Sequence, residues 1–288
     1  MILYLFLSHL GVGIAATLVV VSREAGVKFF RFNAGLAALL IGIALAFRFQ
    51  AIDGLEGQVG QVGPEGQEGA ARVGAIALVA AGGALVLYWA TVGRALARIR
   101  PALAAIAVGG GLVAVVAQAI ALSQGDSMPM RLLTAVSFVS SAALLGTTCT
   151  SMILGHWYLV LPSLEGTHLQ SIVKLHIASL LFRIAVVGAA VFAGIALWEA
   201  GPAPPGIGMN VMNRGSFYGY ITSVEGIFFW QRVLFGLAGP AVLSYLTWET
   251  AKIRSTQSAT GILYVDFFTV VVGEVLAKYL VLATRVPL

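Results

Sequence analysis

The sequence predicts an all-α integral membrane protein, a single bundle of about eight transmembrane helices. Its 288 residues are 59% hydrophobic and only 10% charged, whereas an ordinary soluble domain has about 25% charged residues. The mean hydropathy is +0.94. Apolar runs that approach the roughly 20 residues needed to cross a bilayer as a helix recur along the chain. These features exclude a soluble fold, and they predict one transmembrane domain over residues 1–288 in contact with bilayer lipid.

Eight apolar runs are predicted to be transmembrane helices. The first is interpreted as a retained helix, because it lacks the basic segment and the small-residue cleavage site of a signal peptide. The second is short for a span, whereas the fifth is long enough to tilt or to enter the interface. The predicted spans cover residues 2–22, 32–48, 73–93, 102–123, 132–161, 173–198, 227–249 and 261–284.

The fifth span is unusually rich in hydroxyl groups. Thr147, Thr148, Thr150 and Ser151 surround the single cysteine, Cys149. Such hydroxyls can bond back to their own helix and bend it, or they can line a wet cavity. One thiolate cannot hold an iron–sulfur cluster or a zinc ion, so cluster chemistry would belong to another polypeptide.

Two connections between the predicted spans are long. Residues from about 50–72 are rich in Gly, Gln and Glu, which cannot pack a core, so we expect a flexible loop or one that a partner orders. Residues from about 199–226 open with Gly201-Pro-Ala-Pro-Pro-Gly206, which stops a helix. The aromatic residues that follow favour the membrane interface. Both loops are predicted to lie on the same side of the membrane.

The basic residues are distributed unequally between the two sides of the predicted bundle. Connections after the odd-numbered spans, with their flanks, hold most of them, and the positive-inside rule assigns that side to the cytoplasm. Both termini then lie on the non-cytoplasmic side, and we expect the bacterial inner membrane as the location. Topology accounts for the net charge of +5, so nucleic acid is not an expected partner. The basic residues on this side are Arg23, Lys28, Arg31, Arg94, Arg98, Arg100, Lys174, Lys252 and Arg254.

The last predicted span carries Asp266, Glu274 and Lys278 in a run that is otherwise mostly apolar. Their spacings of eight and four residues put all three on one side of a helix. A charge at membrane depth costs roughly 2.5–3.5 kcal/mol on insertion scales, so such residues face a bundle interior or a wet cavity. With Glu225 near the start of the seventh span, they are predicted to form a proton relay. Alternatively, Lys278 only neutralises Glu274 one helical turn away.

Two arginines, Arg183 and Arg232, also lie inside predicted spans. An arginine stays charged in the membrane and needs a partner. The available acids are Glu225, Asp266 and Glu274. We therefore predict structural ion pairs for both arginines.

Two histidines, His156 and His176, are predicted to lie at similar depth on neighbouring antiparallel helices, near the cytoplasmic surface. Opposed imidazoles on two helices can hold a b-type haem through its iron. A histidine near the surface can instead hydrogen-bond a quinone carbonyl and exchange a proton near neutral pH. A third interpretation is a hydrogen bond to the backbone or to a lipid head group. Apart from the haem iron, no metal site is predicted.

His9 lies in the first predicted span, flanked by Ser8, Gly11 and Gly13. Small neighbours allow another helix or a flat ring to approach closely. His9 is therefore a candidate quinone ligand or a partner in a helix–helix hydrogen bond. The chain contains no nucleotide-binding glycine motif and no nucleophile elbow, so no catalytic residue is predicted in it.

Two stretches resemble the membrane-anchor subunits of polysulfide and dimethyl sulfoxide reductases, the NrfD- and DmsC-like family. The opening Tyr4-Leu-Phe-Leu-Ser-His-Leu-Gly-Val-Gly-Ile-Ala-Ala resembles the first helix of the NrfD and polysulfide-reductase subunits. The ending Gly273-Glu-Val-Leu-Ala-Lys-Tyr resembles the close of the DmsC anchors. The resemblance implies an eight-helix anchor that binds menaquinol or ubiquinol, passes electrons to an iron–sulfur subunit and generally carries no haem. It implies His9 as a quinone ligand, with Glu274 as a weaker candidate.

Residues and resemblance together predict a subunit of a respiratory or related redox complex, itself non-catalytic or contributing a quinone site. It would exchange electrons and protons with a quinone (menaquinone or ubiquinone) and with an iron–sulfur partner. His9 and His156 would contact the quinone. The segment that begins at His156, together with His176, has no counterpart in the resemblance, so a b-haem cytochrome using His156 and His176 stays an alternative. A proton-coupled transporter and a structural membrane subunit are the others.

Overall fold

The computed structural model describes residues 1–56, 65–94, 97–123, 127–160, 166–197 and 217–288. Within these ranges the chain is helical without strands, and eight helical segments are long and apolar enough to span a membrane. The protein is therefore an all-α polytopic membrane bundle, which confirms the predicted fold class. Its elements are α1 (Ile2–Val20), α2 (Gly26–Glu56), α3 (Glu65–Thr91), α4 (Arg100–Leu122), α5 (Met128–Val160), α6 (Gly166–Leu197), α7 (Phe217–Ile221), α8 (Ile227–Val233), the π-helical turn η5 (Leu234–Ala238), α9 (Gly239–Lys252) and α10 (Thr256–Thr284).

Two helices extend well beyond their predicted spans. α2 ends at Glu56 and α3 begins at Glu65, so the prediction of a loop over 50–72 was wrong for the described residues at its two ends. Once a helix is nucleated, each further residue adds one backbone hydrogen bond without a new nucleation cost. The Gln, Ala, Leu and Glu residues at these ends are good helix formers. Residues 57–64 lie outside the described part of the chain.

The second predicted loop, 199–226, ends in the short helix α7 and a 3₁₀ turn (Val224–Gly226). Residues 198–216 lie outside the described part. Phe217 and Tyr220 are buried in an apolar cluster with side chains of α6, α8 and α10. These two aromatic residues thus pack into the bundle rather than at an interface.

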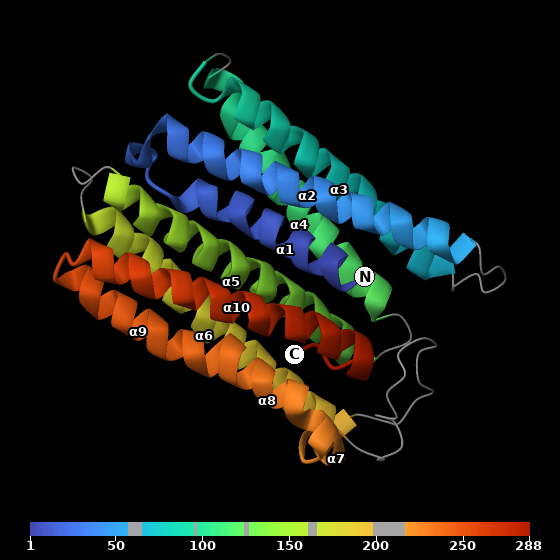
Figure 1. Ribbon diagram of the computed structural model, residues 1–288. Coiled ribbons are helices and arrows are strands. Elements are labelled where there is room, and N and C mark those ends of the chain that lie inside the picture. The colour runs from blue at the N-terminus through green and yellow to red at the C-terminus, as the bar shows by residue number, and fades with distance from the viewer. Residues whose placement is uncertain (57–64, 95–96, 124–126, 161–165, 198–216) are drawn as a thin grey trace.

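Spans that are consecutive along the chain run antiparallel, so the first and last residues lie toward the same end of the bundle (Figure 1). The helices α1–α4 form one group and α5, α6 and α8–α10 form the other, with α1 in contact with both α5 and α10 (Figure 1). We call the end that contains Ile2 and Thr284 the terminal end. The opposite end, where α1 leads into α2 and α9 into α10, carries the basic residues named above and is called the basic end.

Two pairs of glycines let the helices around the bundle centre touch at backbone distance. A Cβ on Gly146 of α5 would lie 2.0 Å from the carbonyl carbon of Gly13 in α1. A Cβ on Gly273 of α10 would lie 2.2 Å from the Cα of Gly236 in η5. Only glycine fits at these crossings, since any side chain would overlap the facing backbone.

The seventh span contains the π-helical turn η5, which the sequence pattern did not indicate. The turn follows Arg232 and stands just before Pro240, near the start of α9. Proline lacks an N–H and clashes with the carbonyl one turn earlier, so it is accommodated where the regular helical bonding is already altered. Such turns are frequent at functional sites, and this one lies beside the charged residues described below.

Replacing Gly146 by leucine is expected to destabilise the bundle, because a side chain there meets the backbone of Gly13. Overpacking costs typically about 1–3 kcal/mol. The measurement is denaturant unfolding of the purified protein in detergent, followed by circular dichroism. Gly109→Leu is the matched control, because nothing lies within 4 Å of a Cβ at that position. Equal unfolding midpoints for the two variants would contradict a tight α1–α5 crossing.

Candidate functional site

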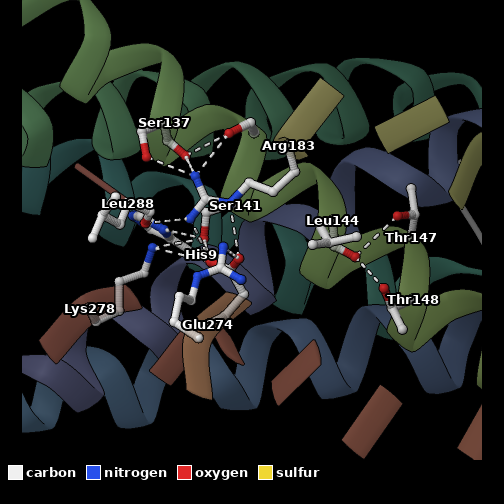
Figure 2. A network of polar contacts seen from close by, with 12 residues as sticks. His9, Ser137, Ser141, Leu144, Thr147, Thr148, Arg183, Glu274, Lys278 and Leu288 are labelled. Atoms are coloured by element: carbon white, nitrogen blue, oxygen red, sulfur yellow. Dashed lines mark hydrogen bonds and ion pairs between the residues drawn. The ribbon is translucent and has the colours of Figure 1, made fainter. Parts of the chain in front are cut away.

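The carboxylate of Glu274 in α10 lies inside the bundle and contacts side chains from α5, α6, α8 and its own helix (Figure 2). Arg183 donates from Nε to Oε1 at 3.0 Å and from Nη2 to Oε2 at 3.1 Å, a bidentate pairing. Arg232 donates from Nη2 to Oε1 at 2.8 Å, and the Ser141 hydroxyl donates to Oε2. Lys278 Nζ lies 3.8 Å from Oε2. We call these five residues the Glu274 cluster.

Arg183 is held by further contacts on α5 and near the end of the chain. Its Nη1 donates to the Ser137 hydroxyl at 2.8 Å, to the Ser137 carbonyl at 3.0 Å and to the Ser140 hydroxyl at 3.2 Å. Its Nη2 donates to the main-chain carbonyl of Leu288 at 2.9 Å. All three nitrogens of this guanidinium therefore have acceptors, so its orientation is set by α5 and α10 together (Figure 2).

Lys278 and His9 lie on the side of the cluster that faces α1. The Lys278 ammonium donates to the Ser141 hydroxyl at 2.7 Å and lies 5.0 Å from the centre of the Phe138 ring. The His9 ring meets the same Phe138 ring edge-on, with centroids 4.9 Å apart. His9 Nδ1 lies 3.4 Å from the Ser141 hydroxyl, whereas Nε2 has no partner among the described residues.

The Glu274 cluster brings three basic side chains to one carboxylate, and all four charged residues are almost fully buried. Among the described residues, Arg232 finds no acceptor for Nε or Nη1. Removing charges from water costs several kcal/mol per ion, and a cation without a full set of acceptors recovers little of it. An arrangement of this kind is a poor source of stability, which favours a functional role for it.

A second buried cluster lies on the same side of the bundle, nearer to the basic end. His176 Nε2 is 2.8 Å from Asp266 Oδ2 and 2.9 Å from the Ser244 hydroxyl, and Nδ1 is 3.1 Å from the Thr148 hydroxyl. We call these four residues the His176 cluster. His176 Nε2 and Asp266 Oδ2 are close enough for an ion pair, but they are not aligned for a hydrogen bond. Neither oxygen of the Asp266 carboxylate accepts a hydrogen bond from the described residues.

Hydrogen-bond directions restrict the protonation of His176. The Thr148 hydroxyl donates to the Leu144 carbonyl at 2.6 Å, so its oxygen is left to accept a proton from His176 Nδ1. Nε2 then has two options. It carries a second proton beside the ionised Asp266, or it accepts from Ser244 while Asp266 is protonated. A proton shared by this pair therefore has two possible places, His176 Nε2 and the Asp266 carboxylate.

The two clusters share α5, α6 and α10 at different depths, and the seventh span adds Arg232 of α8 to one and Ser244 of α9 to the other. Asp266 and Glu274 are eight residues apart on α10, which corresponds to about 12 Å along the helix axis. His176 and Arg183 on α6, and Thr148 and Ser141 on α5, are each seven residues apart. Hydroxyl groups lie between the levels on α5 and α6. Thr147 and Ser179 are in contact at 2.7 Å, and Ser179 donates to the His176 carbonyl at 2.8 Å.

The structure brings together most of the predicted site residues, but it divides the predicted acids and bases between two separate clusters. Both arginines converge on Glu274, whereas Asp266 pairs with His176. Lys278 contacts Glu274 one turn away, and Asp266, Glu274 and Lys278 of α10 all face the interior. The side chain of Glu225 lies outside the described residues.

His156 and His176 do not face each other. His156 is exposed and bonds through Nδ1 to the Tyr264 hydroxyl at 3.0 Å, whereas His176 is buried beside Asp266. Tyr264 and Asp266 are two residues apart, so the two histidines approach different sides of α10. Both ring nitrogens of His176 contact protein groups, and axial coordination of haem iron would require His176 to leave one of them.

Sequence reasoning did not identify the serines that complete both clusters. Ser137, Ser140 and Ser141 hold Arg183, Glu274 and Lys278, and Ser244 contacts His176. The hydroxyl-rich stretch of the fifth span was recognised only from Thr147 onward, although its serines continue about two to three turns earlier. Serine is so common at helix–helix contacts in membranes that its type alone does not mark a site.

These features define the class of protein as a polytopic helical membrane protein with two stacked clusters of buried ionisable side chains. The chain matches no protein-family model, and neither the curated proteins nor the solved structures give a match.

Replacing Glu274 by glutamine is expected to lower the free energy of unfolding strongly, because three buried cations lose their charged acceptor. Breaking a buried pair by removing one partner costs about 3–5 kcal/mol. The measurement is denaturant unfolding in detergent, with Glu249→Gln as the control. Glu249 pairs with Lys252 at 2.7 Å on the surface, where a pair contributes about 0–1 kcal/mol. A loss in E274Q no larger than in E249Q would contradict the assigned role of Glu274.

Proposed function

We propose that this chain is a membrane subunit that conducts protons through the half of the bundle formed by α5, α6, α9 and α10. The observation that carries the proposal is the stacking of the His176 cluster and the Glu274 cluster on the same three helices. Buried ionisable groups in a membrane domain are expensive and are the usual material of proton relays. Two such levels, separated by hydroxyl groups, form a path along the membrane normal.

The His176 cluster supplies a proton-holding site. The proton resides on His176 Nε2 or on Asp266, whose carboxylate oxygen lies 2.8 Å away. The Asp266 oxygens accept no aligned hydrogen bond from the described residues, so neither protonation state is locked by donors. Transfer between two groups within hydrogen-bond reach needs only a small rearrangement.

The Glu274 cluster supplies a second proton-holding site. Lys278 donates to the Ser141 hydroxyl, and Ser141 donates in turn to Glu274. A proton that leaves Lys278 through Ser141 arrives on Glu274, which leaves both groups neutral. Between the two levels, the hydroxyls of Thr147 and Ser179 are placed to pass a proton onward together with bridging water.

A redox role is supported by one further observation, the unpartnered Nε2 of the buried His9. The Ser141 hydroxyl donates to Glu274, so the contact between His9 Nδ1 and Ser141 puts the ring proton on Nδ1 and leaves Nε2 as an acceptor. Such an acceptor fits a hydroxyl group of the reduced form of a quinone (menaquinone or ubiquinone), and the Phe138 ring stands beside it. When bound, a quinone supplies two-electron chemistry coupled to proton uptake. The residues of this chain would then orient the head group through His9 and deliver protons from Lys278 through Ser141.

The assembly and orientation follow from this proposal. The proposed redox role requires a partner that carries electrons, and an iron–sulfur protein is the partner proposed here. The basic end is proposed to face the cytoplasm of a bacterial inner membrane, with the termini on the other side. This places the His176 cluster toward the cytoplasm and the Glu274 cluster nearer the opposite surface.

Proton conduction is tested by reconstituting the purified protein in liposomes that contain a pH-sensitive dye. A potassium diffusion potential is imposed, with and without a short-chain quinol. The wild-type chain is expected to carry a proton flux that falls by about 100-fold or more in Asp266→Asn and His176→Asn, a typical contribution of one proton-transfer group. Glu249→Gln, on the surface, should keep the flux. A wild-type flux equal to that of empty liposomes under both conditions would contradict the proposal.

The role of His9 is tested by extracting the quinone that copurifies with the protein and measuring it per chain. His9→Leu is expected to retain less than about one fifth of the wild-type amount, because leucine cannot hydrogen-bond the ligand and a lost hydrogen bond costs about 1 kcal/mol or more. The exposed His156 serves as the matched control, and His156→Leu should retain the quinone. Equal retention by both variants would remove His9 from the quinone site.

A further inference from the structure

A groove between α2 and α3 opens on the outer surface of the bundle, far from the two buried clusters. It encloses about 660 Å³, within the range of about 300–1,000 Å³ that is usual for ligand sites. The side chains that flank it are apolar, and several of them, such as Leu39 and Val86, are more than half exposed. It is lined by Gly35, Ala38, Leu39, Gly42, Ile43, Ala46, Val86 and Trp89.

The groove follows one face of α2 and is about as long as one leaflet of a bilayer. Its α2 residues run from Gly35 to Ala46, which is about 16 Å along the helix axis. The hydrocarbon core of a bilayer is about 30 Å thick, so the groove matches the depth of a single acyl layer. The small residues at 35, 38, 42 and 46 share one helical face and leave the space that forms its floor.

The same face of α2 becomes basic at the end of the groove. Arg31 and Lys28 continue the stripe toward the basic end, one and two turns before Gly35. The Arg31 guanidinium lies 5.1 Å from the centre of the Trp89 ring, and Trp89 closes the groove at this level. Within the described part of the chain, Arg31 has this ring contact and no ion pair. The Arg31 guanidinium therefore lies where the apolar groove meets the membrane interface.

We propose that this groove binds one acyl chain of an anionic phospholipid, whose phosphate group contacts Arg31 and Lys28. The apolar groove fits the chain, and the two cations at its mouth fit the negative head group. Arg31, a planar donor held against an aromatic ring, suits a phosphate oxygen pair. The site does not depend on the proton path, because none of its residues belongs to either buried cluster.

A second basic and aromatic group at the same end provides an internal control. Lys174 and Lys252 each place an ammonium 5.2 Å from the centre of the Trp248 ring. This group has the same kinds of side chain as the proposed site, but it is not part of the groove lining. Comparing these two basic groups distinguishes lipid binding in the groove from a general attraction of anionic lipid to a basic surface.

The experiment is native mass spectrometry of the purified full chain in detergent, with equal amounts of dioleoyl phosphatidylglycerol and dioleoyl phosphatidylcholine. The wild-type chain is expected to retain phosphatidylglycerol in preference. Arg31→Gln is expected to reduce its retention about fivefold, since one basic residue at the membrane surface has roughly that effect. Gly42→Leu should also abolish the preference, because a Cβ there meets nothing within 4 Å and the side chain fills the groove without disturbing the bundle.

The controls are Lys174→Gln with Lys252→Gln, and Gly109→Leu on α4, where a Cβ likewise meets nothing within 4 Å. Circular dichroism confirms that each variant is folded. Equal retention of the two lipids by the wild type would overturn the proposal, as would losses in the controls that match those of R31Q and G42L. If the wild-type chain gives a dimer mass that is missing for G42L, a second copy of the chain occupies the groove, and this outcome also overturns the proposal. Arg48 lies on α2 two residues beyond Ala46, at the opposite end of the groove. If Arg48→Gln lowers the retention of phosphatidylglycerol and R31Q does not, the head group lies in the other leaflet, which would also overturn the proposal.

Discussion

The carboxylate of Glu274 is the interaction on which the interior of this bundle depends. It receives Arg183 and Arg232 and lies near Lys278, so it is the charged partner shared by three cations from α6, α8 and α10. In a membrane interior, a cation without an acceptor is far more costly than a lost apolar contact. The position of each of these helices is therefore constrained by the need to reach one pair of oxygen atoms.

Close packing of the helices allows the charged side chains to reach the Glu274 carboxylate. Gly273 precedes Glu274 and faces Gly236, so α10 and the π-helical turn meet at backbone distance where Arg232 reaches the carboxylate. A Cβ on Gly236 would itself lie 1.8 Å from the Arg232 guanidinium. On the other side, Gly13 and Gly146 bring α1 against α5, which places His9 beside Ser141. Small residues thus supply the space that the buried charges occupy.

The two buried clusters differ in how their charges are balanced. In the His176 cluster one acid faces one base. In the Glu274 cluster three cations share one carboxylate, and the Ser141 hydroxyl connects that carboxylate to the Lys278 ammonium. The lipid site proposed between α2 and α3 lies in the other helix group. The chain would therefore separate a lipid-facing half from a proton-conducting half.

The sequence by itself determined the class of this protein and the side of the last helix that carries its charges. Hydropathy predicts the eight spans because the bilayer requires long apolar runs, and helical spacing places Asp266, Glu274 and Lys278 on one face whatever the neighbours are. The unequal distribution of basic residues likewise follows from the chain alone. The sequence did not indicate which base pairs with which acid, because ion pairs form between helices whose rotations and depths are set by packing. Only the tertiary structure decided that both arginines meet Glu274, that His176 joins Asp266 rather than His156, and that serines complete both clusters. The reason is physical: a helix face is a local property of the sequence, whereas a partner across the bundle depends on close contacts between residues distant in the chain.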